Sequence, residues 1–282
     1  MSEDDLYESY SSGPWRGKAL RGWGERLGGG DPLEAYLKHP HTAVRHRPGG
    51  HTWRVEIAGR SLYVKHVSAG YVIENEGGWN PGKRLKWALR PSPALELVRM
   101  SAAMEARGIA VPRVIHVARR GFIFRREELV VTEAVEGPHV ALLSARDPAS
   151  AAPLLDLVAD KVRQLHEAGV IHGHLLPGHL LLTENETQVA FIDNDENTIY
   201  RGAAPWRRRL RNLAQMARKL SPFYDTWRPF YRRYFEGSGL PPERWRPMLA
   251  QVLRRAKTRD RGRKSRVERA AEHRRRYAAN AG

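Results

Sequence analysis

The spacing of apolar residues changes along this chain from a pattern typical of strands to one typical of helices. Residues 52–57 and 61–67 alternate apolar with polar side chains, and a shorter strand is expected over 43–47. Residues 149–168 and 206–256 instead carry apolar residues at helical spacing. The pattern therefore predicts an α+β protein with strands concentrated in the first half and helices in the second.

The order of these segments predicts two lobes flanked by less regular ends. A chain of 282 residues, of which 41% are hydrophobic, is long enough for two lobes that share a cleft. We expect four parts: an N-terminal arm over 1–40, a small β-rich lobe over 41–135, a helical lobe over 136–256 and a basic tail over 257–282.

The arm and a second segment are predicted to be loose. The arm is rich in Gly, Ser and acidic residues, with a short helix expected over 32–38. Its tryptophans, Trp15 and Trp23, indicate that parts of it pack against the body. Residues 68–92 combine glycines and prolines with basic residues, so we expect a mobile insertion there, followed by a helix over 93–107.

A histidine-rich loop carries the most chemical information. It reads His172-Gly-His-Leu-Leu-Pro-Gly-His179, and Asp193 follows the apolar run 189–192. This is the layout of a kinase catalytic loop followed by an aspartate that binds the metal. In that layout position 174 is the aspartate that accepts the proton of the substrate hydroxyl, and position 179 is an asparagine. Both are histidine here.

Other expected parts of a nucleotide site precede this loop, in the order along the chain that a kinase requires. Lys65 on the third predicted strand can hold the α- and β-phosphates of ATP, and Glu96 on the next helix can pair with it. Glu105 is the alternative partner on that helix. Gly49 and Gly50 are a poor version of a glycine loop that covers the phosphates.

The segment 131–137 resembles the hinge between two kinase lobes. Backbone groups of Glu133 and Val135 could bond an adenine there, while Asp193 could bind the metal that bridges the phosphates. Each of these features is weak alone, but their shared order favours a two-lobed, protein-kinase-like fold that uses ATP and Mg²⁺.

Seven short segments resemble one family. They are Leu62-Tyr-Val-Lys65, Pro93-Ala-Leu-Glu96, Gly108-Ile-Ala-Val-Pro112, Leu165-His-Glu-Ala-Gly169, His172–Leu182, Ile192-Asp193 and Arg211-Asn-Leu-Ala-Gln-Met216. On these segments the chain resembles the bacterial lipopolysaccharide kinases, which include Kdo kinases, heptose kinases and InaA-type relatives. The resemblance covers roughly residues 43–240.

The resemblance implies an ATP-dependent phosphotransferase that phosphorylates a sugar hydroxyl of the lipopolysaccharide core. His179 fits the heptose-kinase branch, where it could be a metal ligand or a structural hydrogen-bond donor. Active members carry aspartate at the position of His174, whereas some InaA-like members lack it. We hypothesise that His174 orients or deprotonates the acceptor, because a neutral imidazole can accept a proton.

Two other functions remain open at this point. Loss of the aspartate at position 174 is compatible with a pseudokinase, a regulatory module that keeps the fold without catalysis. A nucleic-acid-binding protein is less favoured, because the sequence offers charge but no base-reading motif.

The composition indicates an anionic partner. The formal net charge is +17, with 48 basic against 31 acidic residues, which predicts attraction to polyanions: nucleic acid, anionic lipid or phosphorylated glycan. Of these, the family resemblance implies a phosphorylated glycolipid and the anionic surface of the inner membrane. We found no signal peptide or membrane-spanning run and expect a cytoplasmic location, with peripheral attachment to the inner membrane as an option. Cysteine is absent, which excludes thiolate chemistry.

Overall fold

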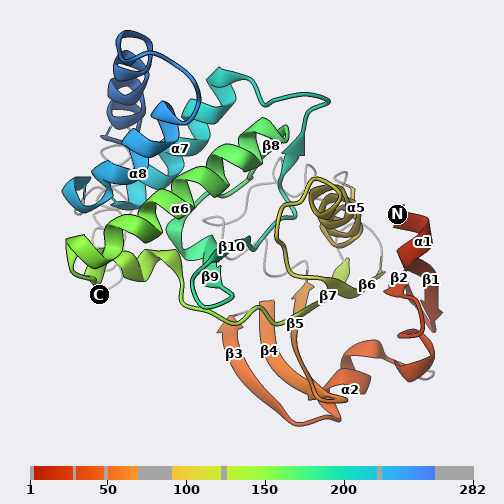
Figure 1. Cartoon of the computed structure of the whole chain (residues 1–282). Coiled ribbons are helices and arrows are strands. Elements are labelled where there is room, and N and C mark those ends of the chain that lie inside the picture. The colour runs from red at the N-terminus through yellow and green to blue at the C-terminus, as the bar shows by residue number, and fades with distance from the viewer. Residues whose placement is uncertain are drawn as a thin grey trace, which may run out of the picture. The chain divides into compact units, whose positions relative to one another are not determined.

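The computed structural model describes residues 3–27, 30–47, 50–68, 91–121, 126–220 and 224–257 (Figure 1). Contacts divide the chain into two compact units. The first comprises Met1–Glu136 with Ala190–Glu196, and the second comprises Gly137–Val189 with Asn197–Gly282. The first unit is rich in strands and the second is mainly helical, which confirms the predicted α+β class.

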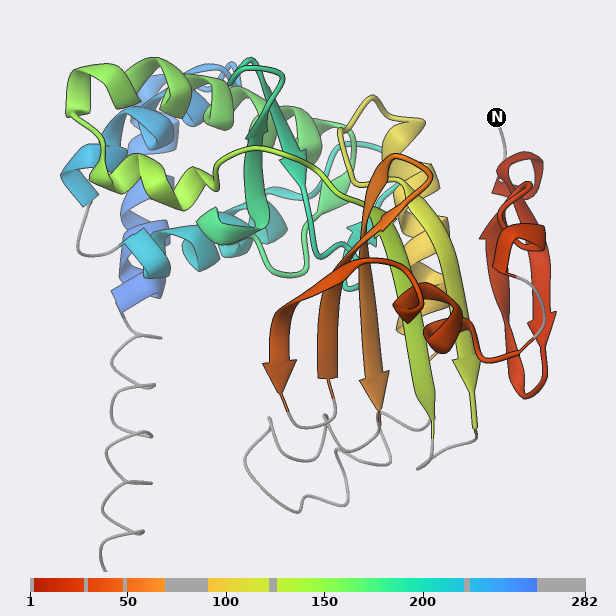
Figure 2. The same cartoon turned by 90° about the horizontal axis from the view of Figure 1, so that it is seen from below.

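A seven-stranded antiparallel sheet forms the frame of the first unit (Figure 2). Its order is β1-β2-β6-β7-β5-β4-β3. The bounds are β1 Tyr7–Ser12, β2 Trp15–Leu20, β3 His41–Arg47, β4 Gly50–Ile57, β5 Arg60–Ser68, β6 Val114–Arg120 and β7 Glu127–Glu133. The predicted three-stranded meander is confirmed as β3, β4 and β5, which pair in sequence.

The first two strands were not predicted from the sequence. We expected a loose arm over 1–40, but β2 pairs with β6 and carries β1 at the edge of the sheet. The expected docking of the tryptophans is confirmed, since Trp15 and Trp23 are both buried in the core of this unit. The short helix is also confirmed as α2, Pro32–Leu37, which Asp31 caps. Two further short helices are α1, Glu3–Leu6, and η1, Glu25–Leu27.

The two faces of the sheet are covered by different elements. Along β5, the buried Leu62 and Val64 point to a face that packs against aromatic residues of the N-terminal segment, such as Trp15 and Tyr36. The opposite face packs against α5, Pro93–Glu105. Because side chains alternate along a strand, Lys65 belongs to this second face.

A buried carboxylate fixes the start of α5. The Ser92 side chain accepts a hydrogen bond from the Leu95 N–H at 3.3 Å, and the Glu128 carboxylate of β7 accepts one from the Ala94 N–H at 3.0 Å. Glu128 also forms an ion pair with Arg126 at 3.1 Å. Burial raises the pKa of Glu128, and the bond from Ala94 opposes that shift. The helix thus begins at a point tied directly to the sheet.

The second unit combines long helices with short strands. Its helices are η3 Val140–Ala145, α6 Pro148–Glu167, η4 Pro177–His179, α7 Trp206–Leu220, α8 Tyr224–Glu236 and a last helix over 242–257. Its strands are β8 Val170–Ile171, β9 Leu180–Thr183, β10 Gln188–Phe191, which ends in the first unit, and β11 Thr198–Ile199. β9 pairs with β10, and β8 with β11. The predicted helix over 149–168 is confirmed as α6.

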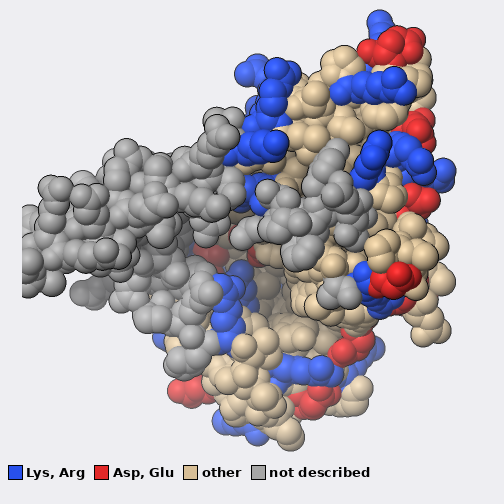
Figure 3. Space-filling model, turned by 90° about the vertical axis from the view of Figure 1, so that its left-hand side faces the viewer, with Lys and Arg blue, Asp and Glu red and all other residues tan. Residues whose placement is uncertain are grey.

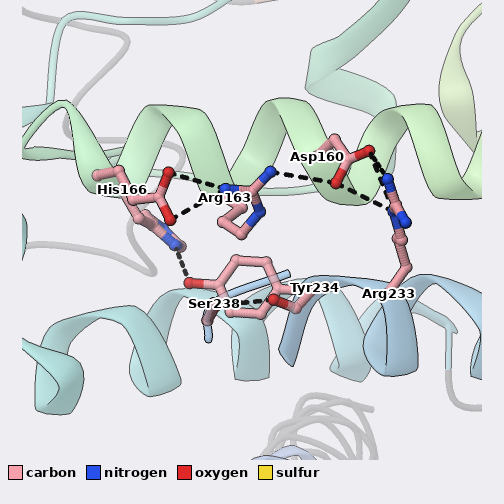
Figure 4. A network of polar contacts seen from close by, with 7 residues as sticks. Asp160, Arg163, His166, Arg233, Tyr234 and Ser238 are labelled. Carbon is pink, nitrogen blue, oxygen red and sulfur yellow. Dashed lines mark hydrogen bonds and ion pairs between the residues drawn. The ribbon is translucent and has the colours of Figure 1, made fainter. Parts of the chain in front are cut away.

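Helices α6 and α8 are joined by a polar network at their shared edge (Figure 4). Asp160 of α6 accepts hydrogen bonds from Arg233 of α8 at 2.8 Å and from Arg163 at 3.3 Å. The ring of His166 bonds the Tyr234 hydroxyl at 2.7 Å. Since His166 and Tyr234 are buried while Arg233 is half exposed, the inner contact is the better shielded from water.

None of the helices in the described ranges combines the length and apolar character needed to cross a membrane. The predicted insertion over 68–92 and the basic tail lie almost entirely outside the described residues.

The close approach of β2 to β6 makes Gly17 a test of the unexpected strands. A Cβ added there would lie 1.9 Å from the Val117 carbonyl oxygen. We predict that Gly17→Ala lowers the free energy of unfolding by about 2 kcal/mol or more, measured by urea denaturation. Gly202→Ala is the control, because an added Cβ there meets nothing within 4 Å. Equal stability of both variants would contradict the pairing.

The buried ring of His116 gives a second test. The centroid of its ring lies 4.2 Å from the centroid of the Tyr10 ring, and neither ring nitrogen has a hydrogen-bond partner among the described residues. Burial lowers the pKa of His116 to about 3. Below about pH 6.5 the unfolded chain therefore binds a proton at this histidine, whereas the folded chain does not. The free energy of unfolding consequently falls as the pH drops from about 6.5 towards 3.

We predict that His116→Phe removes this contribution, which is about 2 kcal/mol between pH 7 and pH 5. Denaturation at the two pH values measures it. His39→Gln, which removes an exposed histidine, should leave the pH dependence unchanged. An unaltered slope in His116→Phe would show that the ring is not buried in its neutral form.

Candidate active site

In the first unit, the structure brings Lys65 and Asp193 together. The Lys65 Nζ lies 3.7 Å from the Asp193 Oδ1, and both side chains are partly exposed. Lys65 occupies a central strand, where it is paired with Thr52 on β4 and Val130 on β7. Strands on both sides therefore fix the position of its backbone. The sequence predicted a role for each residue, and the structure adds that their charges face each other.

Asp193 has an unusual backbone conformation. Its φ is 64°, in the left-handed region that non-glycine residues seldom adopt. The neighbouring Asn194 is buried and its amide donates to the Phe191 carbonyl at 2.7 Å. The Phe191 N–H in turn donates to the Ala110 carbonyl at 2.9 Å. These bonds hold the segment in a conformation that costs energy, a feature common at functional sites.

Glu96 does not pair with Lys65 in the described part of the chain. Its carboxylate accepts a hydrogen bond from Arg99, one turn later on α5, at 2.6 Å. Glu105, the alternative candidate, forms no ion pair with a described residue. Lys65 thus uses the loop carboxylate of Asp193 as its partner, and a role for Glu96 towards a nucleotide stays a prediction.

The predicted hinge keeps part of its hydrogen-bonding capacity. The Glu133 N–H donates to the Arg113 carbonyl at 2.9 Å, and the Ala134 N–H donates to the Ser61 carbonyl at 2.9 Å. An adenine bond at Glu133 would therefore have to use its carbonyl. Val135 follows the end of β7 and is half-buried.

Only one of the two predicted phosphate-covering glycines lies in the described ranges. Gly50 begins β4 and is buried opposite Val67. Gly49 lies outside the described residues.

In the second unit, Asn212 of α7 anchors the histidine-rich loop. Its side-chain oxygen accepts from the His172 N–H at 3.2 Å, and its amide donates to the His172 carbonyl at 2.7 Å. The same oxygen contacts the His166 Nε2 at 3.0 Å. One buried amide thus ties the loop to both α6 and α7.

The geometry defines the protonation of His166. Because the Asn212 oxygen can only accept, the His166 Nε2 carries the hydrogen, and Nδ1 accepts from the Tyr234 hydroxyl. Burial lowers the pKa of His166 to about 4, although the bond to Asn212 acts in the opposite direction. The ring is therefore neutral at physiological pH, and the loop rests on an uncharged network.

Both main-chain groups of His174 are engaged within the loop. Its N–H donates to the His172 Nδ1 at 3.1 Å, and its carbonyl accepts from the His179 Nδ1 at 2.9 Å. His172 is buried, whereas His174 is exposed. Of the two roles expected for His179, the structure shows the structural donor; the metal-ligand role stays a prediction.

Two more side chains that the sequence did not single out support this loop. The Gly173 N–H donates to the Asn197 side-chain oxygen at 2.9 Å, and the Gln215 amide donates to the Gly173 carbonyl at 3.2 Å. Asn197 is buried. Gln215 and Asn212 lie three residues apart, on one face of α7. Both also lie in the segment Arg211-Asn-Leu-Ala-Gln-Met216, which carries part of the family resemblance, but the sequence assigned neither of them a role.

The donor set at Asp193 fits Mg²⁺ better than a metal held by protein groups alone. Magnesium commonly takes one or two carboxylates and completes its shell with water and substrate phosphates. The described residues contain no group of three or more metal-ligating side chains. Imidazole favours other metals. A carboxylate such as that of Asp193 is compatible with this kind of Mg²⁺ site, and its metal-binding role stays a prediction.

Comparison with known proteins identifies first the fold and then the family. A solved structure titled "WaaP in complex with acyl carrier protein" matches with a TM-score of 0.59 and 22% identity, covering 84% of this chain and 96% of that chain. This likeness establishes a kinase-like fold with a strand-rich part and a helical part. A family model described as the lipopolysaccharide kinase (Kdo/WaaP) family matches residues 84–234, more than half of the sequence. The chain belongs to this family. No curated protein matches it.

The Asn212 network predicts a large effect of one substitution. Asn212→Ala removes the Asn212 hydrogen bonds of the buried His166 Nε2 and of both main-chain groups of His172. We expect the free energy of unfolding to fall by about 2–4 kcal/mol, measured by urea denaturation. Gln164→Ala, at an exposed amide of α6, should change it by less than about 0.5 kcal/mol. A small effect at Asn212 would mean that water replaces these bonds.

Proposed function

We propose that this protein is an ATP-dependent phosphotransferase that phosphorylates a sugar hydroxyl of the lipopolysaccharide core. The observation that carries the proposal is the Lys65–Asp193 pair, a lysine on a central strand beside an aspartate of left-handed backbone conformation. Membership of the lipopolysaccharide kinase family supports the choice of acceptor.

Lys65 and Asp193 would serve the nucleotide. Their ion pair is partly exposed and its charges are 3.7 Å apart, so it contributes little stability and can open to admit phosphates. The lysine would then contact phosphate oxygens, and the aspartate would hold Mg²⁺. The metal, when bound, neutralises charge that develops on the transferred phosphoryl group. Glu96 and the backbone of Glu133 and Val135 are further candidates for contacts with ATP.

His174 would act on the acceptor hydroxyl. Its main chain is fixed on both sides by His172 and His179, so the exposed imidazole is held by a rigid loop. A neutral imidazole can orient the hydroxyl or accept its proton. General-base catalysis contributes about 10²–10⁴-fold, and phosphoryl transfer relies mainly on positioning and electrostatics. Histidine in place of aspartate is therefore compatible with activity.

The same histidine favours one alternative, a pseudokinase that binds nucleotide without transferring phosphate. In both cases the basic composition suits a phosphorylated glycolipid and the anionic surface of the inner membrane. We place the protein in the cytoplasm, with peripheral attachment at that surface, and do not favour nucleic acid as a partner.

A transfer assay separates the two functions. We predict that the pure protein transfers label from ATP to core oligosaccharide in the presence of Mg²⁺, and that Asp193→Ala lowers the rate by about 10²-fold or more. His174→Ala should lower it by about 10²–10⁴-fold if the imidazole acts as the base. Glu25→Ala, at an exposed carboxylate of the first unit, is the control.

Undiminished transfer by His174→Ala would remove that residue from the mechanism. Binding of ATP without any transfer to core acceptors would instead identify a pseudokinase.

A further inference from the structure

A groove lined by arginines lies within the second unit, between α7 and the helix over 242–257. Its volume is about 850 Å³. The lining residues are Arg207, Arg208, Arg211, Ala214, Gln251, Arg254 and Arg255, here called the arginine groove. Basic side chains gather in several patches on the face shown in Figure 3. The arginine groove differs from an ordinary charged surface because it is concave.

Helical geometry explains why these side chains converge. Arg207, Arg211 and Ala214 follow the i, i+4, i+7 spacing of one face of α7. Gln251, Arg254 and Arg255 share a face of the last helix by the same rule. The two rows line the groove from opposite sides, with the small Ala214 leaving room between them.

An aromatic stack holds the two helices in place. The rings of Trp206 and Trp245 each stack nearly parallel on Phe235 of α8, with centroids 6.2 Å and 5.9 Å away. Trp206 begins α7, and Trp245 lies near the start of the last helix. Both helices that line the groove are thus packed against the same side chain, which fixes the backbone positions from which the arginines extend.

Four of the five arginines in the groove have no ion-pair partner among the described residues. Arg207, Arg208 and Arg211 form no ion pair with a described residue, and neither does Arg255. Helix α7 contains no acidic residue, and the last helix contains only Glu243, in its first turn. Like charges at these spacings repel and destabilise a helix. A bound anion would remove that repulsion.

We infer that the arginine groove binds a small ligand that carries two or more phosphate groups. Guanidinium groups bind phosphate through paired N–H donors, and five of them can serve more than one phosphate. A volume near 850 Å³ suits a discrete molecule, since small-molecule sites measure about 300–1,000 Å³. A flat bilayer or an extended nucleic acid would not fill a concave site of this size. This inference does not depend on the proposed phosphotransfer.

Calorimetric titration with inorganic pyrophosphate, without ATP or Mg²⁺, tests it. We expect saturable binding by the full-length protein that weakens about tenfold or more in the triple variant Arg208→Gln, Arg211→Gln, Arg255→Gln. The matched control is Arg201→Gln, Arg244→Gln, Arg246→Gln. It removes the same charge from exposed positions outside the groove, two of them on the same helix, and should change the affinity by less than about twofold.

Two further measurements separate this site from others. Lys65→Ala should bind pyrophosphate like the unaltered protein, because Lys65 belongs to the nucleotide site. Loss of binding in Lys65→Ala, or an equal loss in the control triple variant, would overturn the assignment.

Cosedimentation with phosphatidylglycerol vesicles is the last measurement. Vesicle binding that requires the groove arginines, in a protein that does not bind pyrophosphate, would assign a membrane surface and likewise overturn the proposal. Thermal unfolding of both triple variants confirms that they fold.

Discussion

The register of strand β5 is the constraint on which the proposed nucleotide site depends. The strand is paired on both sides, and Lys65 lies opposite Thr52 and Val130. A slip by one residue would turn Lys65 into the apolar core and move Leu62 and Val64 to the opposite face of the sheet. The buried residues on one face thus determine where the lysine on the other face lies. The carboxylate of Asp193, a residue whose backbone is in the left-handed region, then supplies the opposite charge.

The second unit solves a different problem with neutral groups. A loop that presents an exposed histidine needs fixed side chains beneath it, and charged side chains would be costly to bury in that position. Asn212 provides four hydrogen bonds, to His166, to both main-chain groups of His172 and to Gln215. Because burial keeps His166 neutral, the network is fully satisfied without an ion pair.

Sequence reasoning predicted the parts of the fold that follow from local pattern. The meander β3–β5 and helix α6 were found because their apolar residues repeat with clear periods. Strands β1 and β2 were missed, since β2 is stabilised by pairing with β6, far away in sequence, and β1 pairs only with β2 among the described strands. Lys65 and Asp193 were selected from their order along the chain, and their proximity required the structure.

The remaining differences between the predicted and the observed site arise from contacts that form only when the chain folds. Glu96 was expected to pair with Lys65, but an arginine one turn away on the same helix competes for it. Asn212 and Asn197 were not recognised as supports, because an amide acquires such a role only when folding surrounds it with unpaired main-chain groups. The arginine groove was visible only as net charge until two helices placed their rows side by side.

Lys65 and Asp193 are proposed to hold a nucleotide together with Mg²⁺. The most direct test of this role is the affinity for ATP measured with and without Mg²⁺, in the unaltered protein and in Asp193→Asn. We predict that Mg²⁺ tightens ATP binding about tenfold or more in the unaltered protein and has no effect in Asp193→Asn. An affinity that is insensitive to Mg²⁺, or a Mg²⁺ effect that persists in Asp193→Asn, would rule out Asp193 as the metal-binding residue.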